Sequence, residues 1–201
     1  MNLILAAGTQ TRWNATEERG IILPKVKQLV PVNGVPLIVD IQNKFEDSIV
    51  VTNDQEIINN SHKYFKPENS EVTLATLFST RDFWGEWTTI LLGDVLYGRN
   101  TRKLIERQKE SLMFYGDRGE IYAIKFHLRM SVPIIMAIHG IVSSTDFKKK
   151  YGKLWNLYRR LNELDFRKHA IAGMFTYVRD CMDFDNKLQY LRYAKSKEIR
   201  R

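Results

Sequence analysis

The sequence contains a single cysteine, Cys181, and four histidines in 201 residues. One thiol cannot form an internal disulfide, and the histidines stand at no ligand spacing from it or from one another. We therefore expect neither a disulfide framework nor a zinc cluster. A chain without disulfides is typical of a reducing compartment, which predicts a cytoplasmic location.

Long apolar runs are also missing. No stretch approaches the roughly 18 apolar residues that a membrane-spanning helix needs. The apolar opening, residues 2–7, ends at Gly8 and lacks the basic start of a signal peptide. We therefore expect no membrane insertion.

Charge is present in quantity but divided unevenly. The chain has 31 basic and 23 acidic residues, a net charge of +8. Residues 1–98 hold 8 basic and 12 acidic groups, whereas residues 99–201 hold 23 and 11. A basic half is typical of a protein with a polyanionic partner, although charge alone does not distinguish nucleic acid, membrane surface, nucleoside triphosphate and sugar phosphate.

Short apolar runs alternate with helical patterns along the chain. Strands are expected at residues 2–7, 48–52, 71–76, 88–92, 120–126 and 174–178. Helices are expected at residues 36–45, from the capping pair Asn53–Asp54 to Tyr64, and at residues 146–161 and 186–200. This order predicts one α/β domain over residues 1–201, a Rossmann-like three-layer sandwich with a mostly parallel sheet. Its site should lie at the carboxyl ends of the strands. The tryptophans Trp84, Trp87 and Trp155 are expected in the core.

A loop of small residues follows the first strand. Ala6, Ala7 and Gly8 carry little or no side chain, so an anion or a base can approach the main chain. Arg12 places a guanidinium at the end of the loop. A tight turn after a buried strand is the alternative explanation. The candidate nucleotide-binding residues are Leu5, Ala6, Ala7, Gly8, Thr9 and Thr11.

A second segment contains Lys27, followed by Gly34 and Pro36. The two segments together resemble the L-A-A-G-x-G-x-R and P-K-x-L…G-x-P-L signature of nucleotidyltransferases. That superfamily includes sugar-1-phosphate nucleotidyltransferases, choline phosphate cytidylyltransferases and molybdenum-cofactor guanylyltransferases. The resemblance implies the nucleotide-diphospho-sugar transferase fold, which is similar to that of GT-A glycosyltransferases.

The signature is altered at two positions. Gln10 stands where the family has its second glycine, and Val26 stands where it has proline. Pro24 and Lys25 offer a competing alignment, but the spacing to the G-x-P-L tail fits Lys27 without a gap. For either lysine, a solvated loop charge is the alternative.

Two aspartates complete the resemblance. Asp94 follows the strand at residues 88–92, and the segment Asp183–Phe184–Asp185 is similar to the family's D-I-D segment. The resemblance implies that Asp94 and Asp185 bind Mg²⁺ through their carboxylates. A turn beside Gly93 is the alternative role for Asp94, and an N-cap of the last helix is the alternative for Asp185.

The implied reaction is nucleotidyl transfer from a nucleoside triphosphate to a phosphorylated acceptor, such as a sugar 1-phosphate or a similar alcohol phosphate. Arg12 would contact the β- and γ-phosphates, and Lys27 the α-phosphate and the acceptor phosphate. The acceptor phosphate is ionised already, so no general base is required. The basic residues between 99 and 173 are a candidate surface for the acceptor. For Lys148–Lys150, the solvent-exposed face of a helix is the simpler explanation.

Two other functions remain open. A glycosyltransferase of the related fold needs a D-x-D-like motif after the central strand, which Asp94–Val95–Leu96 does not supply. A degenerate relative could bind nucleotide or RNA without turnover. No RNA-binding motif with interleaved aromatics is present, so nucleic acid is not an expected partner. A homo-oligomer is compatible with the sequence.

Overall fold

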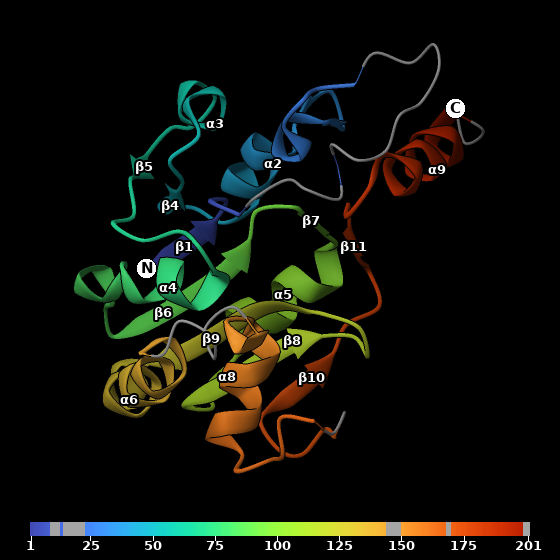
Figure 1. The fold of residues 1–201 in the computed structure, drawn as a ribbon. Helices are drawn as coiled ribbons and strands as arrows, with labels where there is room; N and C mark the ends of the chain where they lie inside the picture. Colours follow the sequence, from blue (N-terminus) through green and yellow to red (C-terminus); the bar gives the residue numbers. More distant parts are fainter. Residues whose placement is uncertain (9–12, 14–22, 144–149, 168–169, 199–201) are drawn as a thin grey trace.

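The computed structural model describes the chain except residues 9–12, 14–22, 144–149, 168–169 and 199–201. Its largest sheet has seven strands in the order β10-β8-β9-β6-β1-β4-β5, with β10 and β5 at its edges (Figure 1). The strands are β1 (Asn2–Leu5), β4 (Ser48–Val51), β5 (Tyr64–Phe65), β6 (Trp87–Leu92), β8 (Leu112–Gly116), β9 (Ile121–His127) and β10 (Phe175–Tyr177).

Most strands of this sheet are parallel, as expected. β1 is parallel to both of its neighbours, β4 and β6, while β5 is parallel to β4 and β10 to β8. Only β9 runs in the opposite direction, antiparallel to β6 and β8. The central strands are buried on both faces, which explains why β1 and β4 are continuous apolar runs.

Helices cover both faces of the sheet. On one face, Ile4 and Leu91 pack in one cluster with α2 (Leu37–Lys44) and α5 (Arg99–Arg107). On the other face, Leu3 and Ile90 pack with α4 (Thr73–Phe78), α6 (Ser131–Val142) and α8 (Leu154–Leu161). The helices α3 (Gln55–Asn59) and α9 (Lys187–Glu198) contribute to the first cluster. The structure thus confirms the three-layer arrangement.

Two small sheets complete the fold. The strands β2 (Pro31–Val32) and β3 (Val35–Pro36) form a hairpin whose turn residues Asn33 and Gly34 have φ angles of 52° and 88°. Asn-Gly suits a turn that needs two positive φ angles. The strands β7 (Val95–Tyr97) and β11 (Cys181–Asp183) pair antiparallel, which brings Asp183 opposite Val95. Three short 3-10 helices are η1 (Lys27–Leu29), η2 (Arg81–Phe83) and η3 (Leu128–Met130).

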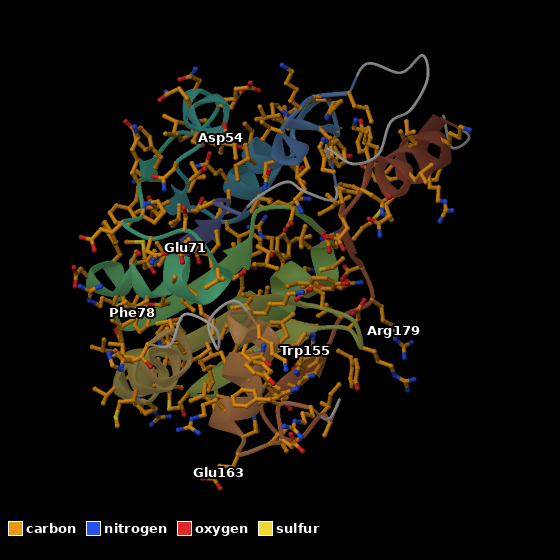
Figure 2. All side chains as sticks on the ribbon, in the orientation of Figure 1. Asp54, Glu71, Phe78, Trp155, Glu163 and Arg179 are labelled. Carbon is orange, nitrogen blue, oxygen red and sulfur yellow. The ribbon has the colours of Figure 1, made fainter. Side chains whose placement is uncertain are left out.

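Several local expectations hold. Asp54 caps α3, because its Oδ1 accepts hydrogen bonds from the backbone of Glu56 and Ile57 at 2.8 and 3.2 Å (Figure 2). Trp84 and Trp155 are buried in the core as expected, whereas Trp87 is only half-buried. The side chain of Trp155 is labelled in Figure 2. Its ring stacks on the ring of Phe175, with the two ring centroids 5.5 Å apart.

Other expectations were wrong. The strand expected at residues 71–76 is instead the helix α4, which begins at Thr73. The helix after Asp54 ends at Asn59, and Tyr64 lies in β5. Within residues 146–161, α8 begins only at Leu154, after a break at Gly152 and Lys153. The helix α6 was not expected. No helix among the described residues is long and apolar enough to cross a bilayer.

Candidate active site

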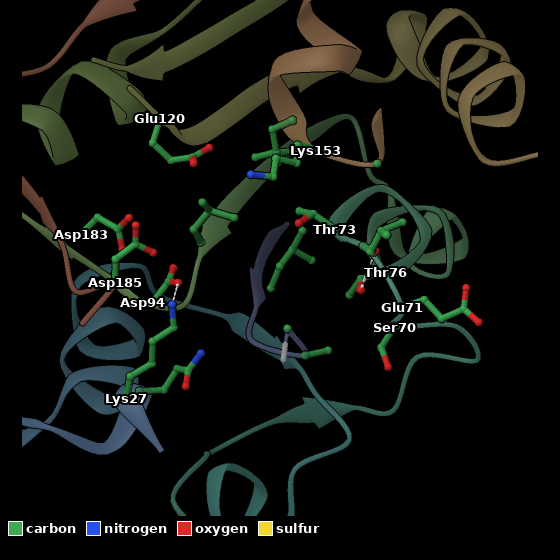
Figure 3. Close-up of a pocket in the computed structure, with 18 residues that line it drawn as sticks. Lys27, Ser70, Glu71, Thr73, Thr76, Asp94, Glu120, Lys153, Asp183 and Asp185 are labelled. Carbon is green, nitrogen blue, oxygen red and sulfur yellow. Dashed lines mark hydrogen bonds and ion pairs between the residues drawn. The ribbon is translucent and has the colours of Figure 1, made fainter. Parts of the chain in front are cut away.

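A cavity of about 290 Å³ opens at the carboxyl ends of β1 and β6. This is the edge of an open α/β sheet where a ligand site is expected. Figure 3 shows Lys27, Asp94, Asp183 and Asp185 on one side, with Ser70, Thr73 and Thr76 across the cavity. The other lining residues are Leu5, Ala7, Gly8, Gln28, Glu71, Val72, Leu92, Glu120, Gly152, Lys153 and Leu154.

The small-residue loop lies at the base of this cavity. Leu5, Ala7 and Gly8 line it, whereas the side chain of Ala6 packs into the core. A Cβ atom on Gly93 would lie 2.9 Å from the Cβ of Ala6, so only glycine lets the end of β6 approach the loop this closely. Thr9, Thr11 and Arg12 lie outside the described residues, as does Gln10.

Lys27 and Asp94 meet in a direct ion pair between Lys27 Nζ and Asp94 Oδ2. Their side chains are 12% and 21% exposed. Burial alone would lower the pKa of Lys27, but the carboxylates of Asp94, Asp183 and Asp185 outweigh it and raise this pKa. Lys25 is exposed and does not line the cavity, so the structure places Lys27, not Lys25, in the site.

The segment Asp183–Phe184–Asp185 alternates between cavity and core. Phe184 is fully buried against Tyr190 and Tyr193, and its backbone N–H donates to the carbonyl of Asp94 at 3.1 Å. The aspartates on either side of it both line the cavity. Extended backbone directs alternate side chains to opposite faces, so the buried Phe184 fixes both carboxylates toward Asp94.

The cap of α9 is formed by Asn186. Its Oδ1 accepts from the backbone N–H of Gln189, and the Gln189 side chain accepts from the backbone N–H of Asn186, both at 3.1 Å. This reciprocal pair is a capping box. Capping therefore does not account for the position of Asp185, which lines the cavity.

The carboxylates of the site perturb one another. Burial first, and then the charges of Asp94 and Asp185, raise the pKa of Asp183 to about 8, while Lys27 opposes the shift. Asp183 Oδ1 is buried and has no hydrogen-bond partner in the described part of the chain. Burial also raises the pKa of Glu120, which Asp94 and Asp185 raise further and Lys153 lowers. Such a cluster attracts cations.

A second cavity of about 590 Å³ adjoins the first. The two cavities share Glu120, Lys153, Asp183 and Asp185. The second continues along Asp117, Gly119, Tyr122, Cys181, Met182, Gln189 and Arg192. Within it, the Tyr122 hydroxyl donates to Asp117 Oδ2 at 2.6 Å. The acid cluster therefore lies where the two cavities meet.

Several residues that line the two cavities were not expected from the sequence, among them Asp183, Glu120 and Lys153. Asp183 lies in a segment that was singled out, but only Asp185 was chosen from it. Glu120 and Lys153 belong to the stretch that carries no motif. Lys153 precedes α8 and points toward the acid cluster (Figure 3). Of the expected lysines, Lys148 and Lys149 lie outside the described residues, and Lys150 lines neither cavity.

No three His, Cys, Asp or Glu side chains of the described residues are grouped as a metal site as they stand. Asp94, Asp183 and Asp185 nevertheless offer only carboxylate oxygens, which are hard ligands. The buried, unpartnered Oδ1 of Asp183 adds an unused acceptor. This donor set suits a hard divalent cation such as Mg²⁺.

Comparison with known proteins gives matches among solved structures. No family model matches the chain, and no curated protein matches its sequence. CTP:phosphocholine cytidylyltransferase from Streptococcus pneumoniae is 13% identical, with 96% of this chain and 97% of that chain covered and a TM-score of 0.61. Inositol-1-phosphate CTP transferase from T. maritima is 9% identical, with 94% and 90% covered and a TM-score of 0.59.

A third similar structure is described as a glucose-1-phosphate thymidylyltransferase from Bacillus anthracis. It is 18% identical, with 95% of this chain and 92% of that chain covered and a TM-score of 0.57. The likeness to these three structures spans nearly the whole of each chain. It confirms that this chain has the nucleotide-diphospho-sugar transferase fold, as the resemblance of its motifs implied.

Proposed function

We propose that this protein is a nucleotidyltransferase, which transfers a nucleoside monophosphate from a nucleoside triphosphate to a phosphorylated acceptor and releases pyrophosphate. The observation that supports this most directly is the cavity at the ends of β1 and β6, where Lys27 faces Asp94, Asp183 and Asp185. The solved structures with this fold include cytidylyl- and thymidylyltransferases. The proposed activity belongs to the same class.

The triphosphate occupies the first cavity in this proposal. The nucleoside lies between the small-residue loop, Leu5 to Gly8, and the wall formed by Ser70, Thr73 and Thr76. Lys27 binds the α-phosphate as a mobile point charge, and its long side chain allows Nζ to follow the phosphate. Arg12, outside the described residues, is assigned to the β- and γ-phosphates because a guanidinium binds phosphate through two parallel hydrogen bonds.

Asp94, Asp183 and Asp185 are the residues that would hold Mg²⁺. When bound, the ion neutralises charge that develops at the α-phosphate during in-line displacement. The three carboxylates would hold the ion in place, and Lys27 adds positive charge beside it, since several negative phosphate oxygens must be brought close together. Because the attacking acceptor phosphate is already ionised, positioning and charge neutralisation carry the catalysis and no side chain needs to remove a proton.

The acceptor occupies the second cavity, with its phosphate at the junction. Lys153 lines both cavities and is the cation that the basic half supplies there. Its position at the junction suits a phosphate that must reach the α-phosphorus. We propose a sugar 1-phosphate or a similar alcohol phosphate as the acceptor, in the cytoplasm. Burial raises the pKa of the Cys181 thiol to about 11, so this cysteine is a poor nucleophile.

A pyrophosphate-release screen tests the proposal. The four common nucleoside triphosphates are each combined with sugar 1-phosphates, inositol 1-phosphate and choline phosphate, in Mg²⁺ and in EDTA. We expect release that needs one triphosphate, one acceptor and the metal. Release from no pair, together with salt-dependent binding of RNA or of nucleotide alone, would favour a binding protein without turnover.

A further inference from the structure

Lys27 and Asp94 are assigned to different partners in the reaction, a phosphate and a metal ion, but in this structure they bind each other. Lys27 Nζ contacts Asp94 Oδ2, and both side chains are largely buried. Asp185 lies on the same side of the cavity and adds its negative charge. The ammonium group of Lys27 is thus a counter-ion of the carboxylate cluster in the free protein.

The same carboxylate cannot serve an ammonium group and a divalent cation equally well. An ion bound by Asp94, Asp183 and Asp185 would lie within a few ångströms of Lys27 Nζ, in a place that is mostly shielded from water. Like charges at that separation repel strongly, because little solvent screens them. Lys27 and the ion therefore compete for Asp94.

The ammonium group of Lys27 can also reach the part of the cavity beside the small-residue loop. Lys27 is the first residue of η1 and lines the same cavity as Ala7 and Gly8. Its four-carbon side chain is flexible, so Nζ can leave Asp94 without a change in the backbone. A triphosphate along the small-residue loop supplies the negative charge toward which Nζ would turn.

We infer that Lys27 holds the place of the metal ion at Asp94 in the free protein and releases it when the ion and the triphosphate arrive together. This inference rests on the proposed function. It couples the two ligands: the ion alone binds weakly, the triphosphate removes the competing ammonium group from Asp94, and each ligand raises the affinity for the other.

Titration of Mn²⁺ without nucleotide tests the inference, with free Mn²⁺ followed by electron paramagnetic resonance. The variants are Lys27→Met and the matched control Lys25→Met, which removes the same charge from an exposed residue outside the cavity. We expect Lys27→Met to bind Mn²⁺ about tenfold more tightly than the wild type, and Lys25→Met to bind it as the wild type does. Adding a non-hydrolysable triphosphate should tighten Mn²⁺ binding in the wild type more than in Lys27→Met.

The inference is overturned if Lys27→Met binds Mn²⁺ no more tightly than the wild type, including the case in which neither binds it. Circular dichroism establishes that each variant folds, and Lys27→Gln replaces Lys27→Met if that variant does not. Failure of the proposed function has a separate signature. If Lys27→Met binds Mn²⁺ more tightly but the wild-type protein releases pyrophosphate from no substrate pair, the inference is sustained and the transferase activity is rejected.

Discussion

Phe184 shows how one buried side chain can fix two functional ones. It fills a pocket beside Tyr190 and Tyr193, and the extended backbone around it places Asp183 and Asp185 on the opposite face. The family resemblance identified only Asp185. The period of two in extended chain would have identified Asp183 as well, because residues on either side of a buried one share a face.

Replacing Asp183 should show how much its buried carboxylate lowers the stability of the folded protein. The pKa of Asp183 is raised to about 8 in the folded protein from 3.8, so the folded state retains a proton that the unfolded state has lost between these pH values. Wild-type stability therefore falls as pH rises through this window. Asp183→Asn has no such proton to lose. In EDTA we expect the melting temperature of Asp183→Asn to exceed that of the wild type by about 2–4 °C or more at pH 8. The difference in melting temperature should be smaller at pH 5.

Asp117→Asn is the control, because folding lowers the pKa of Asp117 whereas it raises that of Asp183. Hydrogen bonds from the Tyr122 hydroxyl and from the backbone of Glu120 and Gly119 outweigh burial and lower the pKa of Asp117. Its contribution to stability is present above the unfolded-state pKa and is lost as pH falls through the folded-state pKa. Asp117→Asn should thus be destabilised at pH 7. Thermal unfolding that shows the same pH trend for both variants would contradict the assignment of the buried charge to Asp183.

Lys153 supplies a second test at the residue scale. It lines both cavities from the basic half of the chain, whereas Lys150 lines neither. If Lys153 binds the acceptor phosphate, Lys153→Met should raise KM for the acceptor about tenfold and leave KM for the triphosphate nearly unchanged. Lys150→Met should change neither KM. Equal effects of Lys153→Met on both KM values would place Lys153 on the triphosphate instead.

At the scale of elements, β7 connects the chain segments that carry the acidic residues of the site. It pairs with β11, which ends at Asp183, and its residue Tyr97 is fully buried. The last residue pair of β6 and β9 is Leu91 with Ala123. Beyond it, the Tyr97 hydroxyl accepts from the Leu92 backbone at 2.9 Å and donates to the Tyr122 carbonyl at 2.6 Å. One side chain thus joins the segments that carry Asp94, Glu120 and Asp183.

Tyr97→Phe should weaken catalysis as well as the fold. The change leaves the Leu92 N–H and the Tyr122 carbonyl without their partner, a cost of about 1–3 kcal/mol in the free energy of unfolding. Tyr158→Phe is a matched control, because its buried hydroxyl accepts from the Ala172 backbone and donates to the Gly173 carbonyl on the other side of the sheet. We expect similar losses of stability, but a lower kcat for pyrophosphate release in Tyr97→Phe alone. An equal kcat in the two variants would reduce Tyr97 to a purely structural role.

The strand that was wrongly expected at residues 71–76 has a physical explanation. In the run Val72 to Leu77, apolar residues satisfy the spacing of a strand and of a helix, and a run of six is too short for periodicity to separate them. Its position decides the outcome: Leu74, Ala75 and Leu77 are all buried where α4 packs against β1, α6 and α8. By contrast, β1 and β4 are buried on both faces and are recognisable from their apolar runs.

At the scale of the whole molecule, the charge division between the halves did not locate the proposed nucleotide site. The acidic half contains Lys27, and the basic half contributes Lys153 together with the acids Asp183 and Asp185. The motifs at both ends of the chain predicted the fold and the ends of β1 and β6 as the site. Glu120 and Lys153, which line the proposed acceptor side, could not be predicted, because they belong to no motif and meet only through the fold. One domain over residues 1–201 and a homo-oligomer stay predictions.

The most direct test of the account is pyrophosphate release by Asp94→Asn. The test uses the triphosphate and acceptor that the screen identifies, with Mg²⁺ present. We expect the variant to fold normally and to release pyrophosphate more slowly than the wild type by a factor of about 100 or more. The reason is that Asp94 is both the carboxylate at the end of β6 and the partner of Lys27. Release at the wild-type rate in Mg²⁺ would contradict the assignment of Asp94 and, with it, the proposed site.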